Sequence, residues 1–285
     1  MGKKAKMSKR KKLFLIVWGL SILAVLAGII LVGFPSGGKE ESITEAMRDA
    51  VLHEENKMSL FGLPVNPGLI SAFLISGILL LFALIVRIFV IPRFKYVPGK
   101  FQAIIEKAVE FFSDMAKGNS PHKTGFVSGY IFSAGLYIFV STIFELFGVQ
   151  WITTKGHSMT LPAPLSDINA AIAMGVTSFL IILGAGIVAN GFKGALKVLK
   201  DFSLPISMSF RLFGALLSGL LVTELVYYYA TMSFVLPVIV GILFTLLHAL
   251  IQAYVLATLV SIFYGEAVEP KKIKDKKIKE KKVKS

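Results

Sequence analysis

Residues 203–219 read SLPISMSFRLFGALLSG, and Arg211 is the single charged residue in this otherwise apolar stretch. The nearest charged residues, Lys200 and Asp201, come before the stretch begins. A guanidinium stays protonated at every physiological pH, so Arg211 cannot avoid the cost of lipid burial by losing its proton. An intramembrane cation by default marks an ion or substrate pathway. We therefore expect the rest of the chain to hold Arg211 beside such a pathway.

The composition predicts a helical membrane protein with several spans. The chain has 285 residues, is 55% hydrophobic and has a mean hydropathy of +0.73. Soluble domains of this size do not contain several apolar runs near 20 residues. The net charge of +14 belongs to two tails, residues 1–12 and 271–285, which contribute +7 each. Since the remaining residues sum to zero, the tails indicate contact with an anionic membrane surface rather than nucleic-acid binding.

Recognisable patterns for catalysis or cofactor binding are absent from the sequence. The chain has no cysteine, which excludes disulfides, thiolate nucleophiles and cysteine-ligated iron–sulfur sites. No glycine-rich loop of the phosphate-binding or dinucleotide-binding type is present. The four histidines are scattered without metal-ligand spacing: His53, His122, His157 and His248. We therefore expect no catalytic residue, no metal and no cofactor.

Six apolar stretches are long enough to cross a bilayer. They are residues 13–34, 69–91, 126–147, 168–189, 203–229 and 238–264. The first has 22 apolar residues behind a basic tail, which favours a retained anchor over a secretory signal with its shorter apolar core. Residues 35–38 (PSGG) would also suit the segment that follows a cleavage, so both interpretations stay open. Residues 35–67 are polar and acidic and predict an external loop, with a short helix around residues 43–52.

Residues 100–119 predict a helix of a different kind. Apolar residues recur at helical spacing along one face, and charged residues occupy the opposite face. The apolar face consists of Phe101, Ile104, Ile105, Ala108, Phe112 and Met115. Such a helix typically lies in the membrane interface, and this interpretation is favoured over a functional patch.

The distribution of lysine and arginine predicts the orientation. With both termini in the cytoplasm, 25 of these cations lie inside and 4 outside, while Arg87 and Arg211 lie within spans. The opposite topology would invert this ratio, which the positive-inside rule disfavours. We see no internal repeat, which argues against the common transporter folds built from duplicated halves.

The last two spans predict a helical hairpin with a turn near Phe234. Arg211 lies about 23 residues before this turn and Gln252 about 18 after it, so at about 1.5 Å per residue their depths differ by less than two turns. The face of Arg211 is made of small residues, which permit close approach of another helix. These residues are Ser207, Gly214, Ala215 and Ser218. On the last span, Thr245, His248 and Gln252 share one face and form a polar stripe.

Three carboxylates fall towards the external ends of their spans: Glu145, Asp167 and Glu224. Together with His248 they would form a titratable lining suited to proton relay. Each also has a structural interpretation, because Glu145 and Asp167 would serve as helix-end residues in water and His248 as a packing residue. The corresponding alternative for Arg211 is snorkelling, since about eight residues, roughly 12 Å, separate it from the start of its span.

Several motifs resemble a known family. PISMSFRLFG (residues 205–214) and LIQAYVLATLVSIFYGEA (residues 250–267) closely resemble subunit a of the F-type ATP synthase, the ion-channel subunit of its membrane sector. RFKYVPGKFQAIIEKAVEF, FELFG and PLSDINAAIAM extend the resemblance, which covers roughly residues 68–268.

The resemblance divides the chain into five parts. They are a basic tail (1–12), an anchor or uncleaved signal (13–34), an external loop (35–67), the domain similar to subunit a (68–268) and a lysine-rich tail (269–285).

The resemblance implies an all-α polytopic fold. Five family-type membrane helices would follow the extra N-terminal apolar helix, with the amphipathic interfacial helix and the C-terminal hairpin among their features. It also implies that Arg211 faces a rotating ring of c subunits, makes each ring carboxylate release its ion and blocks a leak between two offset half-channels. Ser207, Gly214 and Gln252 match family positions, and Glu145 and Asp167 fall where the family places polar or acidic residues. The implied partners are the c ring, the b subunits and the other ATP synthase subunits, in a bacterial inner membrane with a cytoplasmic C-terminus.

The chain departs from the family pattern at several positions. Ala215 stands where asparagine is common, and Lys197 where an acid is often found. The family usually has a charged or histidine pair at the positions of Leu220 and Thr245. Glu224 and His248 are each displaced by about one turn from these positions, and we hypothesise that they jointly replace that pair.

The sequence therefore predicts a non-catalytic stator subunit that conducts protons, or alternatively sodium ions, and couples their flow to rotation and ATP synthesis. A stand-alone transporter or channel is the main alternative, although no substrate site for one is visible. A purely structural membrane scaffold is the second alternative, and in it Arg211 would be dispensable.

Overall fold

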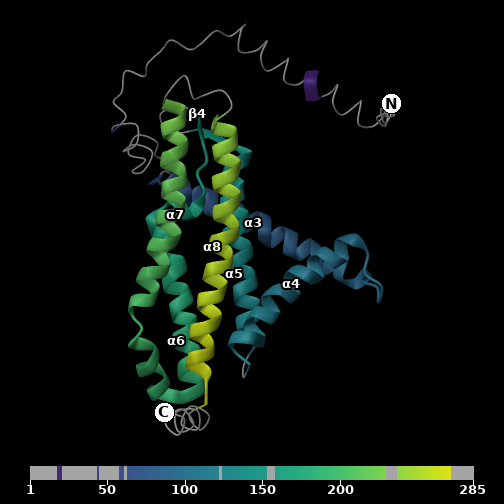
Figure 1. Ribbon diagram of the computed structural model, residues 1–285, viewed down its shortest axis with the longest axis vertical. Coiled ribbons are helices and arrows are strands. Elements are labelled where there is room, and N and C mark those ends of the chain that lie inside the picture. Colours follow the sequence, from purple (N-terminus) through teal and green to yellow (C-terminus); the bar gives the residue numbers. More distant parts are fainter. Residues whose placement is uncertain are drawn as a thin grey trace, which may run out of the picture.

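The computed structural model describes residues 18–20, 44, 58–60, 63–121, 124–152, 158–228 and 236–270. The predicted first span, the predicted short helix at 43–52 and both basic tails lie largely or wholly outside these residues. Four long helices stand upright side by side and form the body of the protein (Figure 1). They are α5 (Gly125–Phe144), α6 (Ile168–Leu199), α7 (Ser203–Tyr228) and α8 (Leu236–Val268).

The core of this bundle lies where α8 packs against α5, α6 and α7. Small buried residues of α8 let its neighbours approach closely, and Ala249, Ala253, Ala257 and Val260 are all less than 9% exposed. Much of the outer surface is apolar, as expected for helices in contact with lipid. Within the described ranges, four helical segments are long and apolar enough to cross a membrane: Pro67–Arg93, Gly125–Phe147, Ile168–Leu199 and Gly241–Val268.

The predicted spans after the first all correspond to helices. α7 is not among these four segments, but its 26 residues extend about 39 Å, which is enough to cross a bilayer. The mostly helical, polytopic architecture is thus confirmed. The full count of membrane helices stays a prediction.

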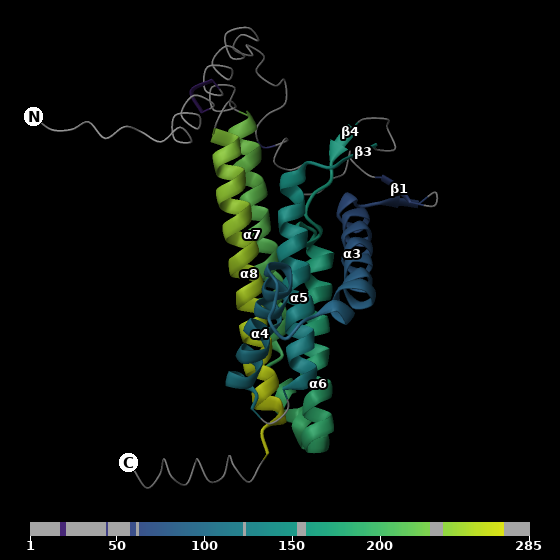
Figure 2. The same cartoon turned by 90° about the vertical axis from the view of Figure 1, so that its right-hand side faces the viewer.

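Helix α3 (Pro67–Ile85) stands beside α5, away from α7 and α8 (Figure 2). Asn66 caps it by accepting a hydrogen bond from the backbone N–H of Gly68 at 2.9 Å, and Pro67 occupies its first turn. Ile70 and Ile75 are buried against Phe144 and Leu161. A π turn (Val86–Val90) and a 3-10 turn (Ile91–Arg93) end this span.

Helix α4 (Lys100–Asn119) has the predicted bounds and runs obliquely to the bundle (Figure 1). Its C-terminal half packs on the bundle: Phe112 contacts Phe132 of α5, and the Asn119 side chain donates a 2.8 Å hydrogen bond to Ser261 of α8. Its N-terminal half projects away, with Phe101 and Ile104 more than half exposed. Its apolar face is therefore divided between the bundle and the surroundings, and its place in the membrane interface stays a prediction.

Short strands connect the helices at the end of the molecule opposite to residue 270 (Figure 2). β1 (Met58–Leu60) pairs with β2 (Leu63–Val65), and β3 (Gln150–Ile152) pairs with β4 (Ser158–Thr160), both antiparallel. Two 3-10 turns, η3 (Glu145–Phe147) and η4 (Pro164–Ser166), lie at the same end. These segments close the predicted external side of the bundle.

Helix α6 changes direction sharply at Gly191, two residues after the end of the predicted span 168–189. Gly191 has φ 59° and ψ −150°, which is not helical and is a conformation that side chains with a β-carbon rarely adopt. After this turn, Gly194 packs directly against the backbone of Gly186, and Val198 approaches Gly186. The segment 192–199 therefore lies back along the preceding part of α6, and α7 begins within the bundle rather than below it.

We predict that Gly191→Ala destabilises the protein by about 1–3 kcal/mol, because alanine at this backbone conformation is strained. The thermal unfolding midpoint of the purified chain in detergent measures the effect. Gly184→Ala is the matched control, since Gly184 lies in the same helix and a β-carbon there would meet no atom within 4 Å. Equal midpoints for the two variants would show that the turn at Gly191 is not required.

Candidate functional site

Arg211 lies on the outer surface of α7. Its side chain is exposed, and so are Ser207, Gly214 and Ser218 on the same side of the helix, while Ala215 is half-buried. In the described part of the chain the guanidinium has no hydrogen bond and no ion pair. The predicted surface of small residues is therefore present as an open stripe along α7 with the cation in its middle.

The opposite face of α7 explains why Arg211 points outwards. Four residues spaced by four are buried in the bundle core: Leu204, Met208, Leu212 and Leu216. This apolar row turns the side of Arg211 away from the core. At Gly175 of α6 the two helices are so close that a β-carbon would overlap the Ser209 side chain and the Pro205 carbonyl. Gly175 thereby fixes the rotation and the height of α7.

A second contact sets the register of α7 against α8. A β-carbon at Gly219 would come to 3.8 Å from Nδ1 of His248, so these two residues are neighbours. Counting from this contact along antiparallel helices, at about 1.5 Å per residue, Arg211 is level with about residue 256 of α8. Gln252 is offset from Arg211 by about one helical turn, towards the predicted external side. This offset is smaller than the two turns that the sequence count allowed.

Gln252 is the buried polar residue of α8 nearest to the level of Arg211. It is 7% exposed, and its Oε1 has no hydrogen-bond partner among the described residues. An unpaired buried acceptor costs about 1–3 kcal/mol, which is rarely retained without a use. The amide oxygen is therefore available to a donor that the described residues do not supply.

Thr245 and His248 continue from Gln252 along α8 towards the predicted external side. Both are half-buried, and the His248 ring lies 5.7 Å from the Phe244 ring, centroid to centroid. The three polar residues thus form the predicted stripe, with His248 at the contact between α7 and α8.

The three predicted carboxylates do not lie in one place: Glu145 and Glu224 lie at one level of α8, and Asp167 lies at the start of α6. Glu145 begins η3 and is half-buried, and the neighbouring Leu146 lies next to Gly241 of α8. A β-carbon at Gly135 of α5 would come to 3.8 Å from the carbonyl oxygen of Ala253 of α8, and counting from this contact puts Glu145 level with about residue 243 of α8. The Gly219–His248 contact puts the backbone of Glu224 at that same level; its side chain lies outside the description. Glu145 and Glu224 are thus about one turn beyond His248.

Asp167 is separated from this group. Its side chain caps α6 by accepting hydrogen bonds from the backbone N–H of Asn169 at 2.8 Å and from its Nδ2 at 3.1 Å. Gly68 at the start of α3 packs against it, since a β-carbon there would lie 3.2 Å from the Asp167 Cβ. The predicted N-cap role of Asp167 is therefore confirmed, and the structure does not bring this carboxylate next to Arg211.

Sequence reasoning missed the residues that hold the end of α8. Asn190 Nδ2 donates to the carbonyl oxygens of Ala267 and Glu269 at 2.9 and 3.4 Å, and Lys197 Nζ donates to the carbonyl oxygen of Glu266. These bonds satisfy backbone acceptors that every helix leaves free at its C-terminus. The dipeptide Asn190-Gly191 is a common turn signal and was the clue available in the sequence. No group of three or more potential metal ligands occurs within the described residues.

The sequence profile of a protein family described as ATP synthase A chain matches residues 70–265. The match covers about two thirds of the chain and extends from the first turn of α3 to the last turns of α8. Arg211, Gln252, His248 and the three carboxylates all lie within it.

We predict that Gln252→Leu leaves the thermal unfolding midpoint unchanged or raises it, because leucine removes a buried acceptor without a partner and keeps a similar volume. The midpoint of the purified chain in detergent measures this, and Ala249→Ser, which adds a hydroxyl at a fully buried position of α8, is the destabilising control. A loss of more than about 1 kcal/mol in Gln252→Leu would show that the amide oxygen is already satisfied.

Proposed function

The chain belongs to the ATP synthase A chain family, and from this premise we propose that it forms the ion pathway of a rotary ATP synthase beside a ring of c subunits. Membership implies a membrane subunit of the Fo sector that translocates ions and is not itself catalytic, with other ATP synthase subunits as its partners. The finer proposal is that two half-channels, each open to one side of the membrane, meet the ring on either side of Arg211.

One observation carries this proposal: Arg211 is an exposed cation on a stripe of small residues, surrounded by apolar helices. A permanently charged group at this depth is costly unless an anion or water compensates it. A carboxylate on a closely packed partner helix would supply that anion, and the small residues allow the approach. Facing the guanidinium, such a carboxylate is stabilised in its charged form and releases its ion.

The same charge acts as a barrier. A cation that moves along α7 from one half-channel to the other would have to pass a fixed positive charge in a low-dielectric setting, which is strongly unfavourable. The ion is therefore carried around on the ring, and its movement is coupled to rotation.

The polar stripe of α8 is proposed to line the external half-channel. Gln252, His248 and Thr245 lead outwards from the level of Arg211, and Glu145 and Glu224 follow about one turn further out. Histidine and carboxylates at such depths suit a proton relay. Asp167 caps the start of α6 on the predicted external side. There it would attract cations to the entrance of this pathway.

The arrangement of the basic segments supports a cytoplasmic C-terminus. The end of α8 contacts Lys197 through Glu266, and Asn119 at the end of α4 contacts Ser261, so three separate segments meet at one end of the bundle. Lysine and arginine concentrate in these segments and in the tail that follows residue 270. Under the positive-inside rule this end faces the cytoplasm, in a bacterial inner membrane. We further propose that the b subunits of the peripheral stalk hold the chain against rotation.

We predict that Arg211→Ala abolishes ion-driven ATP synthesis in the assembled complex, because the ring carboxylate would keep its ion and the barrier between the half-channels would be lost. The measurement is ATP synthesis in inverted vesicles under an imposed ion gradient. Arg87→Ala is the matched control, since Arg87 is an exposed arginine at the end of another span, and it should retain synthesis. Normal coupling in assembled Arg211→Ala complexes would refute the proposal and favour a scaffold.

We also predict that Glu224→Leu and His248→Leu each slow ion flux through the membrane sector, and that the double variant is hardly slower than the slower single one. Two residues in series on one path are expected to be non-additive. Passive ion flux into vesicles stripped of the catalytic sector measures this. Unimpaired flux in the double variant would dismiss the relay, and fully additive losses would separate the two residues.

A further inference from the structure

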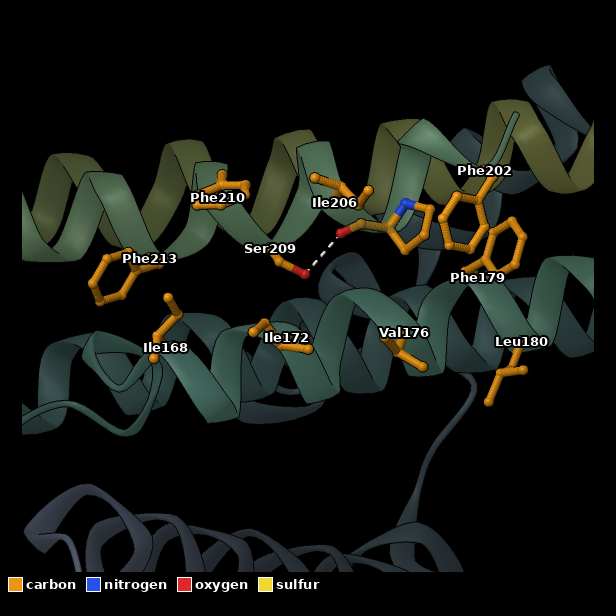
Figure 3. Close-up of a pocket in the computed structure, with 11 residues that line it drawn as sticks. Ile168, Ile172, Val176, Phe179, Leu180, Phe202, Ile206, Ser209, Phe210 and Phe213 are labelled. Carbon is orange, nitrogen blue, oxygen red and sulfur yellow. Dashed lines mark hydrogen bonds between the residues drawn. The ribbon is translucent and has the colours of Figure 1, made fainter. Parts of the chain in front are cut away.

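An apolar groove runs along the outside of α6 and α7, on the flank of α7 away from α8 (Figure 3). It has a volume of about 380 Å³. The wall on α6 consists of residues at helical spacing: Ile168, Ile172, Val176 and Leu180. The opposite wall is formed mainly by Ile206, Phe210 and Phe213 of α7 and by Phe202, which directly precedes this helix. We propose that this groove is a binding site for one acyl chain of an anionic phospholipid. The inference goes beyond the proposed ion pathway and does not depend on it.

The chemistry of the walls selects hydrocarbon. The one polar side chain that lines the groove is Ser209, and its hydroxyl donates a 2.7 Å hydrogen bond to the Pro205 carbonyl (Figure 3). The only side-chain donor among the lining residues is therefore already engaged, and the Ser209 hydroxyl oxygen is the single side-chain acceptor that a polar ligand would find there. Several of its apolar residues are about half exposed, Ile172 at 44%, Leu180 at 57% and Phe210 at 63%. An apolar ligand would gain from covering them.

The dimensions fit a chain from one leaflet. The groove follows α6 from Ile168 to Leu180, which is about 18 Å at a rise of 1.5 Å per residue. Half of a hydrocarbon core of about 30 Å is about 15 Å. The groove is thus slightly longer than the hydrocarbon of a single leaflet, and it runs parallel to the upright helices, as acyl chains do.

The charge at one end of the groove indicates the headgroup. Phe202 closes that end, and Lys200 lies two residues earlier with an exposed side chain. Asp201 between them lines a separate small cavity with Lys197 and Glu266, on the side of α8. Tyr130 near the start of α5 is hydrogen-bonded to Ser178 of α6 at 2.7 Å, which puts this end of the groove close to one end of the α5 span. A phosphate in the interface would therefore lie within the field of Lys200.

The test uses the assembled complex in vesicles of equal parts phosphatidylglycerol and phosphatidylcholine, with a trace of phosphatidylglycerol that carries a photoreactive diazirine in its acyl chain. After illumination, labelled peptides are mapped by mass spectrometry. We expect labelling of the groove walls to exceed labelling of the exposed face of α3. Val176→Trp, which fills the groove, should remove the excess, and Leu84→Trp, at a 57% exposed position of α3, should leave it.

The headgroup is tested separately, by competing the probe with unlabelled lipid of each type. Lys200→Gln should lower the preference for phosphatidylglycerol over phosphatidylcholine by about fivefold, as expected for one lysine near an anionic surface. Lys117→Gln, on exposed Lys117 that pairs with Asp114 on α4, should not change it. Equal labelling of the groove and of α3, or a groove unaffected by Val176→Trp, would overturn the proposal. Labelling of the isolated chain that disappears in the complex would also overturn it, because a partner subunit would then occupy the groove.

Discussion

The close approach of α6 and α7 at Gly175 is the contact on which the site depends. With no β-carbon at Gly175, the Ser209 hydroxyl and the Pro205 carbonyl fit against the backbone of α6. This contact sets the orientation of α7 about its own axis. That rotation buries Leu204, Met208, Leu212 and Leu216, and it leaves Arg211 on the outer surface. The exposed cation is thus a consequence of helix packing at a neighbouring position, and not of any contact made by the guanidinium itself.

Much of the helical layout could be predicted from the sequence, because hydropathy and helical periodicity are local signals. The five spans after residue 67 and the amphipathic helix 100–119 all correspond to helices, and the Asp167 cap occurs where the sequence predicted it. The stripe of small residues around Arg211 followed from spacing alone. In each case the deciding information lies within a few turns of one helix, where the period of 3.6 residues relates sequence directly to surface.

The remainder depends on contacts between distant segments, which one sequence does not reveal. The reversal at Gly191 changes where α7 begins, yet its signal is a single Asn-Gly dipeptide inside an apolar and basic region. The bonds from Asn190 and Lys197 to the end of α8 join residues about 70 to 80 positions apart. The division of α4 between bundle and surroundings likewise depends on Phe112 meeting Gly135, a contact that its amphipathic pattern could not specify.

Hydrogen bonds from other helices hold α8 at its C-terminal end, and this affects how the pair of helices α7 and α8 resists a sideways force. Asn190 and Lys197 of α6 and Asn119 of α4 donate hydrogen bonds to the last turns of α8 and the residues just after it. At the other end α7 and α8 extend beyond α5 (Figure 2), and Leu146 of the η3 turn that follows α5 lies next to Gly241 of α8. A lateral load on the exposed face of α7 would therefore be resisted mainly where these bonds hold α8. For the stator role proposed above, stiffness is needed most between Arg211 and the held end of α8, and several of the side-chain hydrogen bonds between helices lie in this part.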